Sequence, residues 1–104
     1  MITEEFVTRF DTGERDFRKV DLSNAALDNR FLGGADLRGA RLSGACLQAA
    51  NLARANLNGA SLSEVNLRDG MLLFAKMSRS DLAKSDLRRA DLRQARLQIG
   101  RSHV

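Results

Sequence analysis

Residues 35–59 read ADLRG-ARLSG-ACLQA-ANLAR-ANLNG, five consecutive pentapeptides with a leucine at the centre of each. The same register continues in both directions and forms 17 repeats, from residue 15 to residue 99. It contains 15 of the 16 leucines of the chain, while Phe17 and Met77 hold the central position in the two remaining repeats. Because repetition at a fixed period is typical of stacked architectures, this pattern determines the fold.

The positions around each centre also have characteristic residues. The residue two places before the centre is Ala in ten of the 17 repeats, and Val, Gly or Ser in most of the others. Asp or Asn stands directly before the centre in nine repeats. The two residues that follow the centre are mostly Ser, Gly, Arg, Asn, Gln and Ala.

A period of five fits neither an α-helix nor an extended strand. The apolar face of a helix recurs about every 3.6 residues and that of a strand every 2. On a helix these leucines would drift around every side, and on one long strand they would alternate between faces. The chain must therefore turn after every five residues so that each leucine points to a common axis. That arrangement is a solenoid, in which each unit is buried by stacking on its neighbours.

Several repeats match the pattern A-[DN]-L-x-x of a known family. The matching triplets are Ala35-Asp36-Leu37, Ala50-Asn51-Leu52, Ala55-Asn56-Leu57 and Ala90-Asp91-Leu92. The sequence resembles the pentapeptide repeat family over about four fifths of its length. The resemblance implies a right-handed quadrilateral β-helix with four pentapeptides per coil, with the central and the small residue pointing inward. We therefore predict an all-β solenoid of about four coils with a short N-terminal capping α-helix.

The prediction divides the chain into three parts. Residues 1–14 form the capping helix, residues 15–99 the β-helix and residues 100–104 a C-terminal tail. The structural core consists of the central residues of the repeats: Phe17, Leu22, Leu27, Leu32, Leu37, Leu42, Leu47, Leu52, Leu57, Leu62, Leu67, Leu72, Met77, Leu82, Leu87, Leu92 and Leu97. Arg30 takes the small-residue position of its repeat, and an arginine there cannot be buried without a partner. We expect the corner to open at Arg30 and the guanidinium to reach out.

The N-terminal segment is predicted to close the first coil. Thr3 is a suitable N-cap, and Gly13 a suitable end for the helix. Ile2, Phe6 and Phe10 recur every four residues and form one apolar stripe. Phe6 and Phe10 are the predicted cap residues, lying over the ring of core side chains that begins with Phe17. The alternative, a membrane anchor, fits an acidic segment poorly.

The composition argues against several classes of function. The single cysteine, Cys46, and the single histidine, His103, supply too few groups for a zinc site or a Ser-His-Asp triad. Acids and bases on the outside of a rod have no pocket to desolvate them. We therefore expect no catalytic, cofactor-binding or metal-binding residues. No apolar run reaches the length of a membrane span and no signal peptide is evident, which predicts a cytoplasmic protein.

One side of the rod is unusually apolar. With 20 residues per coil, the outward residues Phe31, Met71, Leu73 and Phe74 fall on the same side. A cluster of this kind suggests a contact surface. The alternative is that Met71 and Phe74 fold over a coil loosened near Gly70.

Charge is unevenly distributed along the chain. The formal charge is −3 over residues 1–36, +2 over residues 37–67 and +5 over residues 68–104. Arg68 and Arg88 are expected in one column, and Lys76 and Arg96 in another. Four carboxylates are available to balance these bases on a solvated face: Asp69, Asp81, Asp86 and Asp91. Because no aromatic residue lies among the bases to stack on a nucleotide, we expect no nucleic-acid partner.

These features favour a non-catalytic scaffold that contacts other proteins, since repeat surfaces commonly serve binding. Some members of the resembling family mimic duplex DNA and bind DNA gyrase, but mimicry needs an acidic rod and this chain has a formal charge of +4. A further alternative is binding of an anion, such as nucleic acid, by the basic C-terminal half.

We also expect a homodimer. The candidate interface residues are Phe31, Met71, Leu73, Phe74, Leu97 and Ile99. An end-to-end contact would bury the open last layer at Leu97, and a side-by-side contact would bury the apolar side. The end contact is slightly favoured, since an open layer leaves leucines and backbone groups unpaired.

Overall fold

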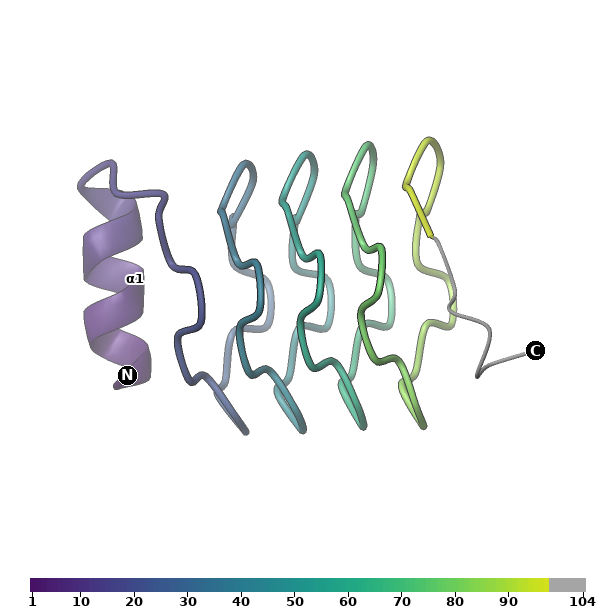
Figure 1. Cartoon of the computed structure of the whole chain (residues 1–104), viewed down its shortest axis with the longest axis horizontal. Coiled ribbons are helices and arrows are strands. Elements are labelled where there is room, and N and C mark those ends of the chain that lie inside the picture. The colour runs from purple at the N-terminus through teal and green to yellow at the C-terminus, as the bar shows by residue number, and fades with distance from the viewer. Residues whose placement is uncertain (98–104) are drawn as a thin grey trace.

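The computed structural model describes residues 1–97 and consists of one helix followed by a solenoid (Figure 1). The helix, α1, spans Thr3–Asp11. From Asp16 onward the chain forms isolated parallel β-bridges, each joining a residue to the one 20 positions later. The first bridge joins Asp16 to Asp36 and the last joins Lys76 to Arg96. A constant offset of 20 means four pentapeptides per coil, as the family resemblance implied.

Backbone hydrogen bonds hold each coil to the next in a regular ladder. The central residue donates to the next coil along the chain, as in the 2.7 Å bond from the Leu22 N–H to the Arg41 carbonyl. The residue before the centre donates to the preceding coil, as in the 2.9 Å bond from the Arg41 N–H to the Val20 carbonyl. Each inner coil therefore pairs many of its peptide groups with its two neighbours.

Each repeat turns a corner through a tight β-turn. In the first full coil the Ala25 N–H donates to the Leu22 carbonyl at 3.1 Å, which closes the turn. The third residue of the turn has a left-handed conformation, with φ near +60° at Asn24 and +76° at Gly34. Such a φ is required at this position of a type II turn. The same conformation recurs two places after the centre in every repeat from Phe17 to Leu92.

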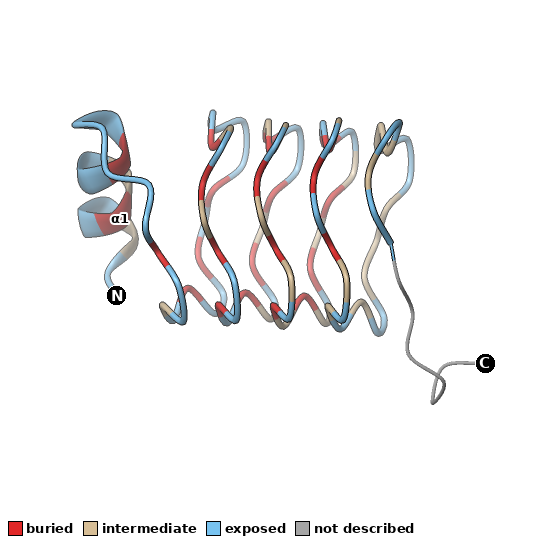
Figure 2. Ribbon diagram, turned by 45° about the horizontal axis from the view of Figure 1, so that its top comes forward, coloured by how far each residue is buried: buried red, intermediate tan, exposed pale blue. Residues whose placement is uncertain are grey.

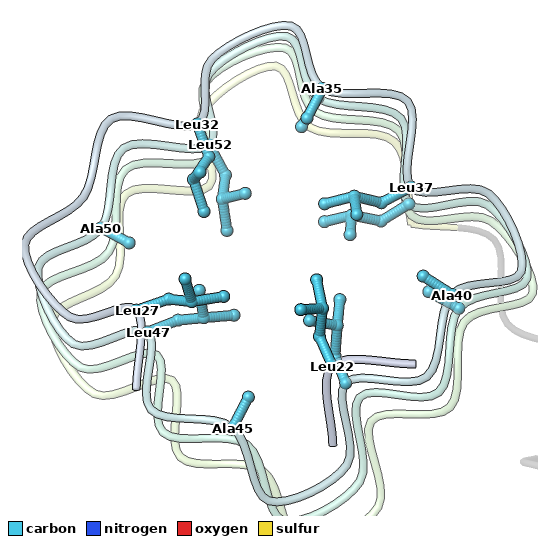
Figure 3. Close-up of a cluster of buried hydrophobic side chains, with 14 of the residues drawn as sticks. Leu22, Leu27, Leu32, Ala35, Leu37, Ala40, Ala45, Leu47, Ala50 and Leu52 are labelled. Atoms are coloured by element: carbon cyan, nitrogen blue, oxygen red, sulfur yellow. The ribbon is translucent and has the colours of Figure 1, made fainter. Parts of the chain in front are cut away.

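The central residues fill the interior in layers (Figure 3). Leu22, Leu27, Leu32 and Leu37 point toward a common axis, and alanines lie at the corners beside them. The central residues from Phe17 to Met77 are essentially inaccessible to solvent. Small corner residues are needed because the turn brings backbone close to the leucine, and dense packing leaves no room for a larger side chain.

Burial decreases in the last described coil, as the tan and pale blue segments of Figure 2 show. Leu82, Leu87 and Leu92 are only partly buried, and Leu97 is 45% exposed. The sequence assigned Leu97 to the core, but within residues 1–97 no coil lies beyond it to cover it. The predicted tail, residues 100–104, and the candidate interface residue Ile99 lie outside the described residues.

Helix α1 covers the first coil. The Phe6 ring packs edge-on against the Phe17 ring, with 4.6 Å between centroids, and Phe6 and Phe10 are both buried. The N-terminal amine donates to the Asp21 carbonyl at 2.9 Å, so the start of the chain pairs with an open edge of the coil. Arg15 donates to the Phe10 carbonyl at 2.8 Å and lies over the Phe10 ring.

Two expectations about the helix were wrong. Ile2 occupies the N-cap position and makes no side-chain capping bond, whereas Thr3 is the first helical residue. Ile2 is also 71% exposed and does not join the stripe of Phe6 and Phe10. The helix is held by its aromatic contacts and by the amine bond of Met1, and these do not require a capping side chain.

Candidate functional site

One side of the solenoid carries the exposed apolar side chains, and we call it the apolar side. It comprises the outward residues of the repeats centred on Leu32, Leu52 and Leu72: Phe31, Gly33, Gly34, Asn51, Ala53, Arg54, Met71, Leu73 and Phe74. Phe31, Met71 and Phe74 are 61%, 41% and 50% exposed. The other exposed large apolar residues among residues 1–97 lie at the two ends of the rod: Met1, Ile2 and Leu97.

Phe31 links the apolar side to the cap. Its ring lies over Gly33, where an added Cβ would come within 2.7 Å of the ring carbon Cζ. The same ring lies 6.1 Å from the Phe10 ring of α1 in an edge-to-face arrangement. Glycine at position 33 therefore allows Phe31 to lie flat against the corner.

The coil at Gly70 is regular, so the alternative of a loosened coil is wrong. Gly70 donates to the Leu67 carbonyl and Met71 to the Ala50 carbonyl, at 3.0 and 2.9 Å, as in every other coil. Leu72 is fully buried beneath them. Met71 and Phe74 are thus exposed on an intact solenoid.

Phe74 occupies the left-handed position of its turn, with φ +59°. Bulky side chains are rare in this conformation because the Cβ atom crowds the following carbonyl. The guanidinium of Arg54 lies over the Phe74 ring, 4.9 Å from its centroid, in a cation–π contact. An aromatic residue is therefore held in a strained conformation while half of its surface remains in solvent.

A recurring Asp–x–Arg motif forms ion pairs across the turns. Asp16 accepts from the side chain and the backbone N–H of Arg18, and Asp36 accepts in the same way from Arg38. The pairs of Asp86 with Arg88 and of Asp91 with Arg93 repeat this geometry. The motif lets one carboxylate close the turn and bind a base at once, a local arrangement that asparagine and aspartate favour.

These hydrogen bonds stabilise the charged form of the carboxylates. The Arg18 side chain lowers the pKa of Asp16 to about 2. Arg88 and then Arg68 hold the pKa of Asp86 still further below its usual range.

The bases of the C-terminal part fall into two groups, those with a carboxylate partner and those without one. Arg68 and Arg88 share Asp86, while Arg89 pairs with Asp69 in the preceding coil. Asp91 pairs with Arg93, so three of the four predicted carboxylates balance bases, whereas Asp81 has no Lys or Arg partner within 4.0 Å in residues 1–97. The remaining bases have no carboxylate within 4.0 Å among residues 1–97: Lys76, Arg79, Lys84 and Arg96. Lys76 and Arg96 are β-bridge partners, so two like charges lie one above the other.

The described residues contain little that could support catalysis or hold a metal. Within residues 1–97 no three His, Cys, Asp or Glu side chains gather closely enough to bind a metal ion. A shallow surface depression of about 380 Å³ is lined by Asp16, Arg18 and Lys19. The Asp16 carboxylate in it already accepts a hydrogen bond from the Arg18 guanidinium. Cys46 is a partly exposed free thiol, and His103 lies outside the described part of the chain.

No helix in the described chain is both long and apolar enough to cross a bilayer. This finding concerns residues 1–97 alone.

The sequence missed two features of this surface. It gave no sign that position 74 is left-handed, because the equivalent turn positions hold residues as different as Gly, Glu and Arg. It also missed the Asp–x–Arg pairs, although residues two apart in an extended chain point to the same face. The signal for the pairs was present in the repeated spacing of Asp before the centre and Arg after it.

Comparison of the sequence with protein families finds one match. A profile described as pentapeptide repeats matches residues 16–52, 45–82 and 60–98, with eight copies. A search among curated protein sequences found no match.

Solved structures give a consistent result. A pentapeptide repeat protein from the thylakoid lumen of Arabidopsis thaliana superposes with a TM-score of 0.52 at 20% identity, over 89% of this chain and 74% of that one. A pentapeptide repeat protein from Nostoc PCC 7120 is 31% identical over 92% of this chain and 75% of its own, with a TM-score of 0.39. HetL from Nostoc, a pentapeptide repeat protein involved in regulating heterocyst differentiation, is 30% identical over 91% of this chain and 48% of its own, with a TM-score of 0.41.

Proposed function

Because this chain belongs to the pentapeptide repeat family, we propose that it is a non-catalytic scaffold whose outward columns contact other proteins. One observation carries the proposal: apart from Arg15 and Arg30, the inward positions hold only leucine, Phe17, Met77 and small residues, whereas the three outward positions vary freely over an intact ladder. A fold that keeps its core separate from its surface can present different residues to a partner without losing stability.

Affinity capture from a lysate of the source organism, with side-specific variants, tests the scaffold proposal. Each variant changes two exposed residues of one side, such as Arg41→Ser with Glu64→Ser, and is first shown to melt like the wild type. We expect capture of a defined protein that is lost in the variants of one side and retained in those of the others. Capture that is equally strong in every side variant would contradict a surface-specific contact.

A second candidate is the binding of an anionic partner by the bases that have no carboxylate within 4.0 Å in residues 1–97. The stacked pair Lys76 and Arg96, with Arg79 on the same side of the rod, supports it, since an anion would relieve the repulsion between like charges. A gel-shift titration with nucleic acid at increasing salt tests this candidate, using Lys76→Ser with Arg96→Ser against Arg41→Ser as the control. Binding that depends on salt and is lost only in the double variant would support it.

We further propose a cytoplasmic location. Fractionation of cells that express the tagged full chain tests this, and recovery in a membrane or organelle lumen would overturn it.

A further inference from the structure

The apolar side has a step in the size of its residues along the rod. At the first level the corner between Leu32 and Ala35 holds Gly33 and Gly34, and a Cβ added at Gly34 would meet nothing within 4 Å (Figure 3). Two coils further on, the same positions hold Leu73 and Phe74. Ala53 and the exposed Arg54 lie on the level between them. At these two positions the side is thus low at Gly34 and high at Leu73 and Phe74, while the Phe31 ring covers Gly33.

Two copies of the rod fit together at this step when their apolar sides face each other and the rods run antiparallel. A twofold axis that crosses the rod at the level of Ala53 exchanges the first and third levels. It places Phe74 of each copy against the open space at Gly34 of the other. It also brings Leu73 onto the flat ring that Phe31 lays over Gly33. A parallel arrangement would instead oppose Phe74 to Phe74 and leave the glycines facing an empty space.

Charge favours the same orientation. Residues 1–36 carry eight acids and five bases, a charge of −3, whereas residues 68–97 carry eight bases and four acids, a charge of +4. Antiparallel rods bring each acidic end beside a basic end, and parallel rods or two joined C-terminal ends bring like charges together. Arg54 meets its own copy near the axis, but it already lies over the Phe74 ring and extends toward solvent at the corner.

The residue types on the apolar side are a further sign of a contact. Phe, Met and Arg are residues enriched in protein interfaces, and all three occur together on this side.

From the size step, the charge distribution and the residue types, we propose that the apolar side is the interface of an antiparallel side-by-side homodimer, related by a twofold axis at the level of Ala53. This inference does not depend on the proposed scaffold function. It selects the side contact over the end contact at Leu97 that the sequence slightly favoured.

Sedimentation velocity of the full chain at tens of micromolar tests the dimer. We expect a dimer for the wild type and a monomer for Phe74→Asn, because asparagine accepts a left-handed backbone but removes the ring. Arg79→Asn is the matched control, since Arg79 has φ +60° at the same turn position on another side, and it should remain dimeric. A monomeric wild type, or a dimer that survives Phe74→Asn but is lost in Leu97→Glu, would overturn the proposal.

Cross-linking tests the position of the axis. In a Cys46→Ser background, Ala53→Cys should form an intermolecular disulfide under mild oxidation, because the residue lies beside its own copy. Ser63→Cys takes the equivalent place after a central leucine on another side and should stay uncross-linked. Absence of a cross-link at position 53, or equal cross-linking at both positions, would overturn the proposed geometry.

Discussion

Leu52 and Arg54 lie two residues apart but face opposite environments, one fully buried and the other exposed. We predict that Leu52→Asp prevents folding, because it places an uncompensated charge inside the leucine layers. Arg54→Asp should change the unfolding free energy by only about 0.5 kcal/mol, as is usual for surface substitutions. Urea denaturation followed by circular dichroism measures both, and equal losses would show that the repeat register is wrong.

Ala49 and Ala50 allow a similar test of the turn. Ala49 is exposed and left-handed, with φ +59°, whereas Ala50 is buried at the next corner position. We predict that Ala49→Asn raises the unfolding free energy by about 0.5–1 kcal/mol, because asparagine tolerates this conformation better than alanine. Ala50→Asn should lower it by about 3 kcal/mol through burial of an unpaired amide. Denaturation curves that show Ala49→Asn to be the more harmful substitution would contradict this assignment of the turn.

The sequence predicts the conformation of a position only where the residue types at that position are restricted. Inward positions were predictable because nearly all of them hold leucine or a small residue, with Phe17 and Met77 as the exceptions among the centres. The left-handed position was not, because the turn imposes its φ on Lys19, Glu64 and Phe74 alike. Because the hydrogen-bonded ladder stabilises all three turns, this backbone conformation tolerates many residue types and cannot be recognised from any one of them.

The helix α1 covers the first coil through a cluster of aromatic contacts, of which the pair of Phe6 and Phe17 is the shortest. Phe6 is inaccessible to solvent and its ring lies 4.6 Å from that of Phe17. We predict that Phe6→Ala lowers the unfolding free energy by about 3–5 kcal/mol, the usual cost of removing a buried phenylalanine. Thermal melts compare it with Thr8→Ala, a substitution at an exposed position of the same helix.

A small effect of Phe6→Ala, no larger than that of Thr8→Ala, would mean that the first coil does not need its lid. The helix itself was predictable from the spacing of Phe6 and Phe10. Its start was not, because the bond from the Met1 amine to the Asp21 carbonyl depends on an edge that exists only after the first coil forms.

The whole solenoid should lose stability in acid over a defined range. The pKa of Asp16 is about 2 in the folded chain against an ordinary value of 3.8, and arginine or serine partners also lower the pKa values of other carboxyls: Asp21, Asp36, Asp69, Asp86 and Asp91. The folded state therefore binds fewer protons than the unfolded state. The resulting stability is fully present above about pH 5 and is lost as the pH falls through 4 toward 2.

Melting temperatures measured between pH 7 and pH 2 check this prediction. Asp86→Asn and Arg88→Gln should each make the acid decline shallower, since both remove the same pair. A melting temperature that is independent of pH down to 2, or a decline unchanged in both variants, would contradict it.

The offset of 20 between β-bridge partners restricts how such a molecule can change length. Insertion or deletion of four repeats lengthens or shortens the rod by one coil. Every later residue then keeps its original side, and the surface pattern is unchanged. Insertion of a single repeat preserves the alternation of leucine and small residues but rotates everything after it by a quarter turn. Arg54 and Phe74 would then lie on adjacent sides. Duplications in the gene can thus rearrange the surface without touching the core.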